Sequence, residues 1–428
     1  MICPLDGRYK DKLKELEEYF SEEALNKTRV KVELVYLIKL VGFLKTVRLT
    51  SEEKKRLISW GKQLASKDFI RVKEIEVKIK HDVKAVEYFI RENLEKLKLT
   101  KLSTWVHWGL TSEDVNNLSY GLILTRFKNE QWLKLEKQLQ GKILELAEKY
   151  KGTAMPARTH GQLAVPTTMG KELAVFGFRA DFWLEQLKEL KLGGKLNGAV
   201  GNFNAQVKLY PGKDWLKFSC DLVEGLGLNW SMATTQVEPG DRLALMLDLA
   251  RGANNVWLDL ARDCWLYIAL DYFKQKAIKK EVGSSTMPHK VNPIDFENAE
   301  GNLQLSNSLF NMMSNKLTVS RLQRDLSDST VKRNLGVAFG YGWLARKSLL
   351  AGLDKIEPNK EVLKQELENH PEMLSELEQL KRRAQGDVRG YEKVKESIRS
   401  LKPVKGFQVE DYIGLAVKIT ESTIRRLK

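Results

Sequence analysis

Proline and cysteine are scarce in this chain, which has 10 prolines and 3 cysteines among 428 residues. Proline interrupts helices because it lacks a backbone N–H and clashes with the preceding turn, so its scarcity permits long helices. The cysteines lie far apart, at Cys3, Cys220 and Cys264, with no CxxC pair. This spacing predicts neither a disulfide framework nor a zinc site. No other metal or cofactor motif is recognisable, so we expect no cofactor.

Long apolar runs are missing as well. No uncharged stretch reaches the ~18 residues that suggest a transmembrane helix. The first residues, Met1 to Asp6, lack the apolar core of a secretory signal. We therefore expect no membrane partner and a cytoplasmic location.

The charge is one-sided but not clustered. Lys and Arg number 71 against 56 Asp and Glu, which gives a formal charge of +15. A basic balance fits nucleic acid, a membrane surface or small acidic substrates. Because the basic residues are interleaved with Glu and form no block, we favour an anionic small substrate and expect no nucleic-acid partner.

Helical periodicity dominates the chain. Apolar residues recur three or four positions apart in long stretches, which are 11–48, 51–98, 112–150, 166–193, 239–279 and 293–317. This pattern predicts an all-α fold built as a long-helix bundle. We expect an N-terminal helical domain at 1–111, a central long-helix domain at 112–352 and a C-terminal helical domain at 353–428. The apolar stripes are wider than one chain needs, which favours a symmetric oligomer.

Polar and glycine-rich segments separate these helices, at 107–114, 157–162, 197–202 and 281–293. Such segments commonly carry function. In the last one, two serines precede Lys290 and Asn292, and a helix is expected to open at Pro293. Backbone N–H groups, a lysine and an amide there suit an anion, although a polar loop with a helix cap explains the composition equally well.

The segment from Gly283 to Pro293 resembles the signature loop GSSxMPxKxNP of the fumarase/aspartase superfamily. Members of that superfamily eliminate fumarate from succinyl-bearing substrates. The resemblance implies that Ser284 is the catalytic base, that Lys290 and Asn292 bind a substrate carboxylate, and that Glu297 orients a catalytic histidine.

Further segments resemble the adenylosuccinate lyases within that superfamily, at 4–9, 80–83, 107–117, 158–162, 234–238 and 324–334. The resemblance therefore extends from residue 4 to about residue 340. Gln206 is a mild departure, because some members carry histidine there. The implied substrates are adenylosuccinate and the succinylated aminoimidazole carboxamide ribotide (SAICAR). The implied assembly is a homotetramer in which three chains build each active site.

The elimination needs a general acid for the leaving nitrogen, anchors for carboxylates and cations for a phosphate. His160 is the best acid, because imidazole titrates near neutrality. His81 is a second candidate for proton transfer. Thr111 and Ser112 begin the 112–150 helix and suit a carboxylate, although Thr111 also fits a simple helix cap. The remaining predicted substrate residues follow from the matching motifs; they are Arg8, Tyr9, Asp82, Thr159, Gln236, Arg324, Ser329 and Arg333.

Three alternatives remain open from the sequence. The first is a sister lyase that acts, for example, on argininosuccinate. The second is a helical scaffold protein that has lost catalysis, which the presence of Ser284, His160, Lys290 and Glu297 argues against. The third is a nucleic-acid-binding helical protein, which only the charge suggests.

Overall fold

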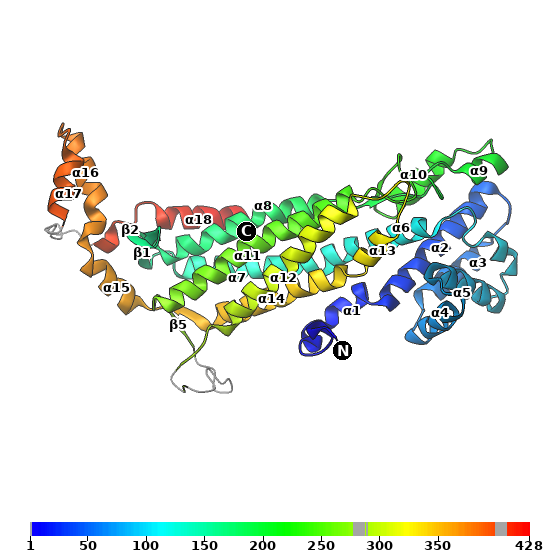
Figure 1. The fold of residues 1–428 in the computed structure, drawn as a ribbon, viewed down its shortest axis with the longest axis horizontal. Helices are drawn as coiled ribbons and strands as arrows, with labels where there is room; N and C mark the ends of the chain where they lie inside the picture. Colours follow the sequence, from blue (N-terminus) through cyan, green and yellow to red (C-terminus); the bar gives the residue numbers. More distant parts are fainter. Residues whose placement is uncertain (1, 277–286, 288–289, 399–408) are drawn as a thin grey trace. The chain divides into compact units, whose positions relative to one another are not determined.

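The computed structural model describes residues 2–276, 287, 290–398 and 409–428. The helices are α1 (Lys14–Phe20), α2 (Glu22–Leu44), α3 (Ser51–Lys62), α4 (Ser66–Ile79), α5 (Asp82–Lys96), α6 (Ser112–Phe127), α7 (Leu133–Lys149), α8 (Met169–Glu189), α9 (Asn204–Leu209), α10 (Trp215–Gly225), α11 (Asp241–Ala269), α12 (Ile294–Leu317), α13 (Ser327–Lys332), α14 (Leu335–Lys355), α15 (Lys360–Asn369), α16 (Ser375–Ala384), α17 (Gly390–Ser397) and α18 (Ala416–Leu427) (Figure 1). The predicted all-α fold is confirmed.

Strands are short and occur in pairs within the described part of the chain. They are β1 (Ala154–Thr159), β2 (Gln162–Thr168), β3 (Gly193–Gly194), β4 (Asn229–Trp230), β5 (Phe273–Gln275) and β6 (Ile356–Pro358). The pairs β1–β2 and β5–β6 are antiparallel, and β3–β4 is parallel. None of the described helices is both long and apolar enough to cross a membrane.

The chain forms two compact units. Unit 1 consists of Met1–Lys134, Gln186–Arg251 and Leu305–Trp343, and unit 2 consists of Leu135–Glu185, Gly252–Gln304 and Leu344–Lys428. Each unit gathers segments that are distant in sequence. The three domains expected at 1–111, 112–352 and 353–428 stay a prediction.

The predicted long helix over 112–150 is present, with one irregularity. α6 and α7 are joined by a π-helical turn at Lys128–Trp132. The Nζ atom of Lys128 donates hydrogen bonds to the carbonyl oxygens of Leu187, Lys188 and Leu190. It thereby satisfies carbonyls that the end of α8 leaves without helical partners.

The two helices expected over 11–48 and 51–98 are instead five shorter ones. The backbone explains the breaks. Ser21 caps α2 by accepting a hydrogen bond from the backbone of Ala24. Thr50 and Glu53 form a capping box at α3, and Lys80 ends α4 in the left-handed conformation. The sequence pattern showed the helical period but not these local stops.

Unit 2 is built around a hydrophobic cluster contributed by α7, α8, α11, α12 and α14 (Figure 1). Trp257 lies fully buried in this cluster. Its indole N–H donates to Glu136 Oε2 over 2.7 Å. Glu136 also pairs with Arg346, and both of these side chains are 0% exposed. The core of unit 2 therefore holds a completely buried ion pair.

We expect Arg346→Met to lower the stability of the protein by about 3–5 kcal/mol, because it leaves the Glu136 carboxylate buried without its cation. Adding Glu136→Gln should restore most of that loss, since the amide oxygen can still accept from Trp257. Urea denaturation of the wild type, the single variant and the double variant measures both effects. A single variant as stable as the wild type would contradict the electrostatic role of the pair.

Candidate active site

The N-terminus of α6 places Thr111 and Ser112 in a polar setting within unit 1. Thr111 is the N-cap residue, and its backbone N–H donates to Asp114 Oδ2 over 2.9 Å. Its own side chain makes no capping hydrogen bond to the described helix. The Thr111 hydroxyl is therefore not used in capping. The start of α6 also offers backbone N–H groups that suit an anion.

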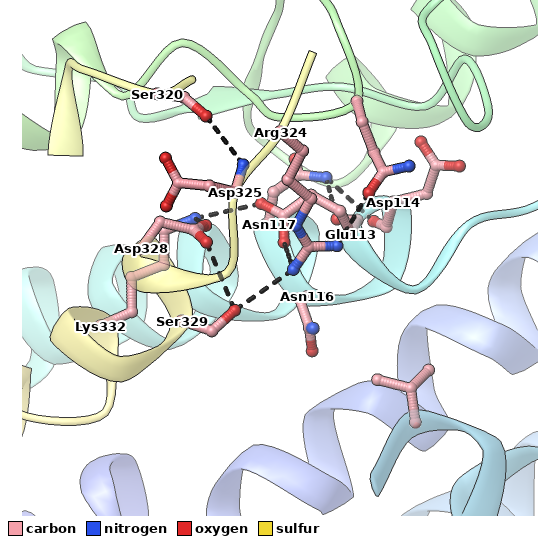
Figure 2. A network of polar contacts seen from close by, with 12 residues as sticks. Glu113, Asp114, Asn116, Asn117, Ser320, Arg324, Asp325, Asp328, Ser329 and Lys332 are labelled. Carbon is pink, nitrogen blue, oxygen red and sulfur yellow. Dashed lines mark hydrogen bonds and ion pairs between the residues drawn. The ribbon is translucent and has the colours of Figure 1, made fainter. Parts of the chain in front are cut away.

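Charged residues collect beside this helix start (Figure 2). Glu113 is 1% exposed and accepts from Lys332 Nζ over 3.0 Å. Lys332 also reaches Asp328 Oδ2 over 3.0 Å. Burial on its own would lower the pKa of Lys332, but the carboxylates of Glu113 and Asp328 outweigh it and raise the pKa. Lys332 therefore remains a cation in the folded protein.

Arg324 connects three of the predicted substrate residues. Its Nη1 donates to Gln236 Oε1 over 3.1 Å and its Nη2 donates to Ser329 Oγ over 3.2 Å. Gln236 in turn donates to the carbonyl of Ala199 over 2.8 Å. Gln236 and Arg324 line a pocket of about 450 Å³ together with Ala199, Val200, Leu322, Gln323, Asp325 and Leu326. The structure thus brings Gln236, Arg324 and Ser329 together, and their binding of substrate stays a prediction.

Asp82 joins two arginines. Its Oδ2 lies 2.8 Å from Arg29 Nη2 and 2.9 Å from Arg333 Nη2. Burial would raise the pKa of Asp82, but Arg29, the backbone N–H of Val83 and Arg333 together lower the pKa below its usual value. Arg333 follows the last residue of α13, and its backbone N–H donates to Ser329 O over 3.3 Å. Ser329 and Arg333, four residues apart, therefore lie on one face of this helical turn.

Of the three other predicted residues of unit 1, Arg8 and His81 are exposed and Tyr9 is half-buried. His81 is the N-cap residue of α5, where its Nδ1 accepts from the backbone of Lys84 over 3.2 Å. Arg8 lies over the ring of Tyr9, with its guanidinium carbon 5.9 Å from the ring centroid. The N-cap contact supports a structural role for His81. Its role in proton transfer stays a prediction.

His160 belongs to unit 2 and lies at the tip of the β1–β2 hairpin. Thr159 pairs with Gln162, so the turn consists of His160 and Gly161, whose φ angles are 53° and 75°. Positive φ at both positions is the geometry of a tight hairpin turn whose twist matches its strands. Arg158 Nη1 donates to Gly161 O over 3.3 Å, which fixes the turn. The imidazole is exposed at a well-defined position.

Glu297 also belongs to unit 2, near the start of α12. Its Oε1 accepts from the indole N–H of Trp265 over 3.1 Å. No hydrogen bond joins it to His160 among the described residues. Lys290 is exposed and Asn292 is half-buried just before α12. Ser284 lies outside the described residues, so its role as the catalytic base stays a prediction from the sequence.

The chain is similar to known lyases over its whole length. The family profile described as lyase matches residues 7–305, and that described as adenylosuccinate lyase C-terminal matches residues 320–428. The chain is 44% identical to adenylosuccinate lyase of Escherichia coli (strain K12), over 100% of this chain and 94% of that protein. It is 45% identical to adenylosuccinate lyase of Haemophilus influenzae, over 93% of this chain and 88% of that protein.

The chain belongs to the adenylosuccinate lyase family. Its fold is also similar to that of 3-carboxy-cis,cis-muconate lactonizing enzyme from Pseudomonas putida, with a TM-score of 0.77. That likeness covers 97% of each chain at 17% identity, so it concerns the fold alone. Membership of the adenylosuccinate lyase family makes this chain a lyase.

Several polar residues that the sequence analysis did not select lie beside the predicted ones. Glu113, Asp114, Asp328 and Lys332 all lie within or beside motifs that matched the adenylosuccinate lyases. Their burial was the missing information, because in sequence they resemble ordinary charged helix residues. Lys195 had no local signal at all, since it is one of 71 basic residues.

We expect Arg333→Ala to weaken nucleotide binding by about 1.5–3 kcal/mol, as for the loss of a charged hydrogen bond, with a smaller effect on kcat. Steady-state kinetics would show this as a raised KM. Arg71→Ala is the matched control, because Arg71 has similar exposure and pairs with Glu92 outside the site. A change confined to kcat, or an equal rise of KM in the control, would contradict a phosphate-binding role for Arg333.

Proposed function

We propose that this chain eliminates fumarate from adenylosuccinate to give AMP, and from SAICAR to give AICAR, in purine nucleotide biosynthesis in the cytoplasm. The observation that carries the proposal is 44% identity over the whole chain to an adenylosuccinate lyase. The match of residues 320–428 to the adenylosuccinate lyase C-terminal profile favours this activity over that of a sister lyase. No cofactor is required for such an elimination.

The elimination removes a proton from a carbon beside a carboxylate. That proton is weakly acidic, so the negative charge that develops on the carboxylate must meet donors already in place. Lys290 supplies a charge and Asn292 an amide for one carboxylate. The hydroxyls of Thr111 and Ser112 and the first N–H groups of α6 serve the other carboxylate. Thr159 contributes a further hydroxyl beside His160.

Ser284 removes the proton and His160 delivers one to the leaving nitrogen. A serine hydroxyl is barely ionised at neutral pH, so Ser284 needs a nearby cation such as Lys290 and exclusion of water. Glu297 stabilises the protonated imidazole of His160 and holds its ring. His81 is the second candidate for a proton-transfer role.

The nucleotide phosphate binds to Arg8, Tyr9, Arg324, Ser329 and Arg333. Arginine forks match the geometry of phosphate oxygens. Asp82 holds Arg333 through the ion pair described above, and Gln236 orients Arg324. The net charge of +15 favours the approach of a substrate that carries a phosphate and two carboxylates.

A homotetramer with shared active sites completes the proposal. On α8, Val175, Phe178 and Phe182 are 39%, 46% and 62% exposed. Their spacing of three and four residues places them on one helical face. On α11, the neighbouring side chains Trp265 and Leu266 are 40% and 50% exposed. Large apolar side chains in such numbers on long helices favour burial against other copies of the chain.

The purified protein should release fumarate from adenylosuccinate, with a parallel change in ultraviolet absorbance, and should release none from argininosuccinate. The phosphate-binding residues favour the nucleotide, because a site built for a phosphate leaves its arginines unpaired with other substrates. Activity on argininosuccinate alone would support the sister lyase. Inactivity on both, in a folded protein, would support the scaffold alternative.

Subunit mixing tests the shared site. His160→Ala and Ser284→Ala should each be almost inactive, and a mixture should regain part of the activity after mild dissociation and reassembly. Activity returns because some mixed sites receive His160 from a Ser284→Ala chain and Ser284 from a His160→Ala chain, and so contain neither mutation. Mixing without subunit exchange is the control and should give no activity. Verified exchange with no recovery, or a monomeric mass in solution, would rule out the shared site.

A further inference from the structure

A second completely buried ion pair lies in unit 1, beneath the proposed substrate residues. Lys195 and Asp114 are both 0% exposed, and Lys195 Nζ lies 2.9 Å from Asp114 Oδ1. Neither residue reaches the surface, so neither is placed to contact a substrate. The sequence analysis assigned no role to either one.

All three N–H donors of the Lys195 ammonium have acceptors. One faces Asp114, and the other two donate to the carbonyl oxygens of Gly198 and Gln236, each over 2.8 Å. Lys195 thus ties the 197–201 turn to the segment that carries Gln236. The Gln236 side chain then accepts from Arg324.

Asp114 makes the complementary set of bonds. Its carboxylate accepts from the backbone N–H groups of Thr111, Asn197 and Gly198 over 2.9, 3.1 and 3.2 Å. Thr111 is the N-cap residue beside the proposed carboxylate anchor. One ion pair is therefore bonded to the start of α6 on one side and to the Gln236 segment on the other.

The backbone around the ion pair is closely packed. It therefore has little room to rearrange when the pair is lost. Asn117 binds Lys195 at both backbone atoms, accepting from its N–H over 2.8 Å and donating to its carbonyl over 3.1 Å. Gly201 has φ of +85°, and a Cβ added there would lie 2.2 Å from Thr234 O. A side chain at residue 201 would therefore force the two segments apart.

We propose that Lys195 and Asp114 are positioning residues that set the distance between the carboxylate end of the site, at Thr111 and Ser112, and the nucleotide end, at Gln236 and Arg324. The inference rests on the proposed function, because the two ends are defined by a substrate that carries both groups. A buried ion pair is weak evidence for stability, since well-packed apolar residues often serve equally well. A role in fixing the distance between the two ends explains why Lys195 and Asp114 both form hydrogen bonds with backbone groups of those ends.

The test compares the intact substrate with its nucleotide half. In Lys195→Met, kcat/KM for adenylosuccinate should fall roughly 100-fold, the size expected when substrate groups are misplaced by about 1 Å. The inhibition constant of AMP should stay within about fivefold of the wild type, because AMP occupies one end only. Fumarate release, with AMP as competitive inhibitor, gives both numbers.

Arg346→Met is the matched control, because it breaks an ion pair of equal burial in unit 2, where Arg346 bonds to Glu136 and Asn254. Circular dichroism confirms which variants are folded. If Lys195→Met does not fold, Asp114→Asn, which changes charge without changing size, is judged by the same criteria.

Wild-type kcat/KM in the variant would overturn the proposal, and so would equal losses for adenylosuccinate and AMP. An equal kinetic loss in Arg346→Met would also overturn it, because any buried charge would then have the same effect. A folded wild type that releases no fumarate would instead overturn the proposed function itself.

Discussion

The carboxylate of Asp114 is the constraint on which the site in unit 1 depends. A carboxylate removed from water must find donors for its lone pairs, because an unpaired buried charge is too costly to keep. Asp114 obtains them from Lys195 and from three backbone N–H groups. Those N–H groups belong to the start of α6 and to the 197–201 turn. The hydrogen bonds to the Asp114 carboxylate therefore fix these two polar segments in place. The exposed residues next to them are then held rigidly.

Around this centre, carboxylates hold the cations in place. Asp82 occupies Arg333, and Glu113 occupies Lys332. Such pairs keep arginine and lysine side chains ordered, which lowers the entropy lost when a phosphate arrives. They also oppose binding, because the phosphate must compete with a carboxylate for the same N–H groups. The exposed pair between Asp82 and Arg333 opposes it less than the buried one between Glu113 and Lys332, since water screens the former. Arg333 is thus given up to a ligand more readily than Lys332.

The sequence was informative where a signal is local. Helical period gave the all-α fold and the long helices from 112, 239 and 293. The polar segments 107–114 and 197–202 carry the backbone N–H groups that bond to Asp114. It failed where structure depends on contacts distant in sequence. The β1–β2 hairpin was missed because its strands are short and its turn, His160-Gly161, lacks the usual asparagine. Lys195 was missed because a buried lysine cannot be told from an exposed one until the chain is folded. Ser284 stays a sequence prediction, outside the described residues.

The setting of His160 bears on the proposal that more than one chain builds the site. A general acid is most effective when neighbouring groups bring its pKa near the working pH. Water weakens the electrostatic interactions by which those groups act. The imidazole is exposed at the tip of its hairpin, while Glu297 is held by Trp265. The indole N–H uses one carboxylate oxygen and carries no charge, so the other oxygen stays able to accept from an imidazole. His160 itself adopts a left-handed backbone conformation, with φ of 53°. This combination is the one expected if another chain covers the hairpin and brings the remaining groups, which is the arrangement that the proposed tetramer provides.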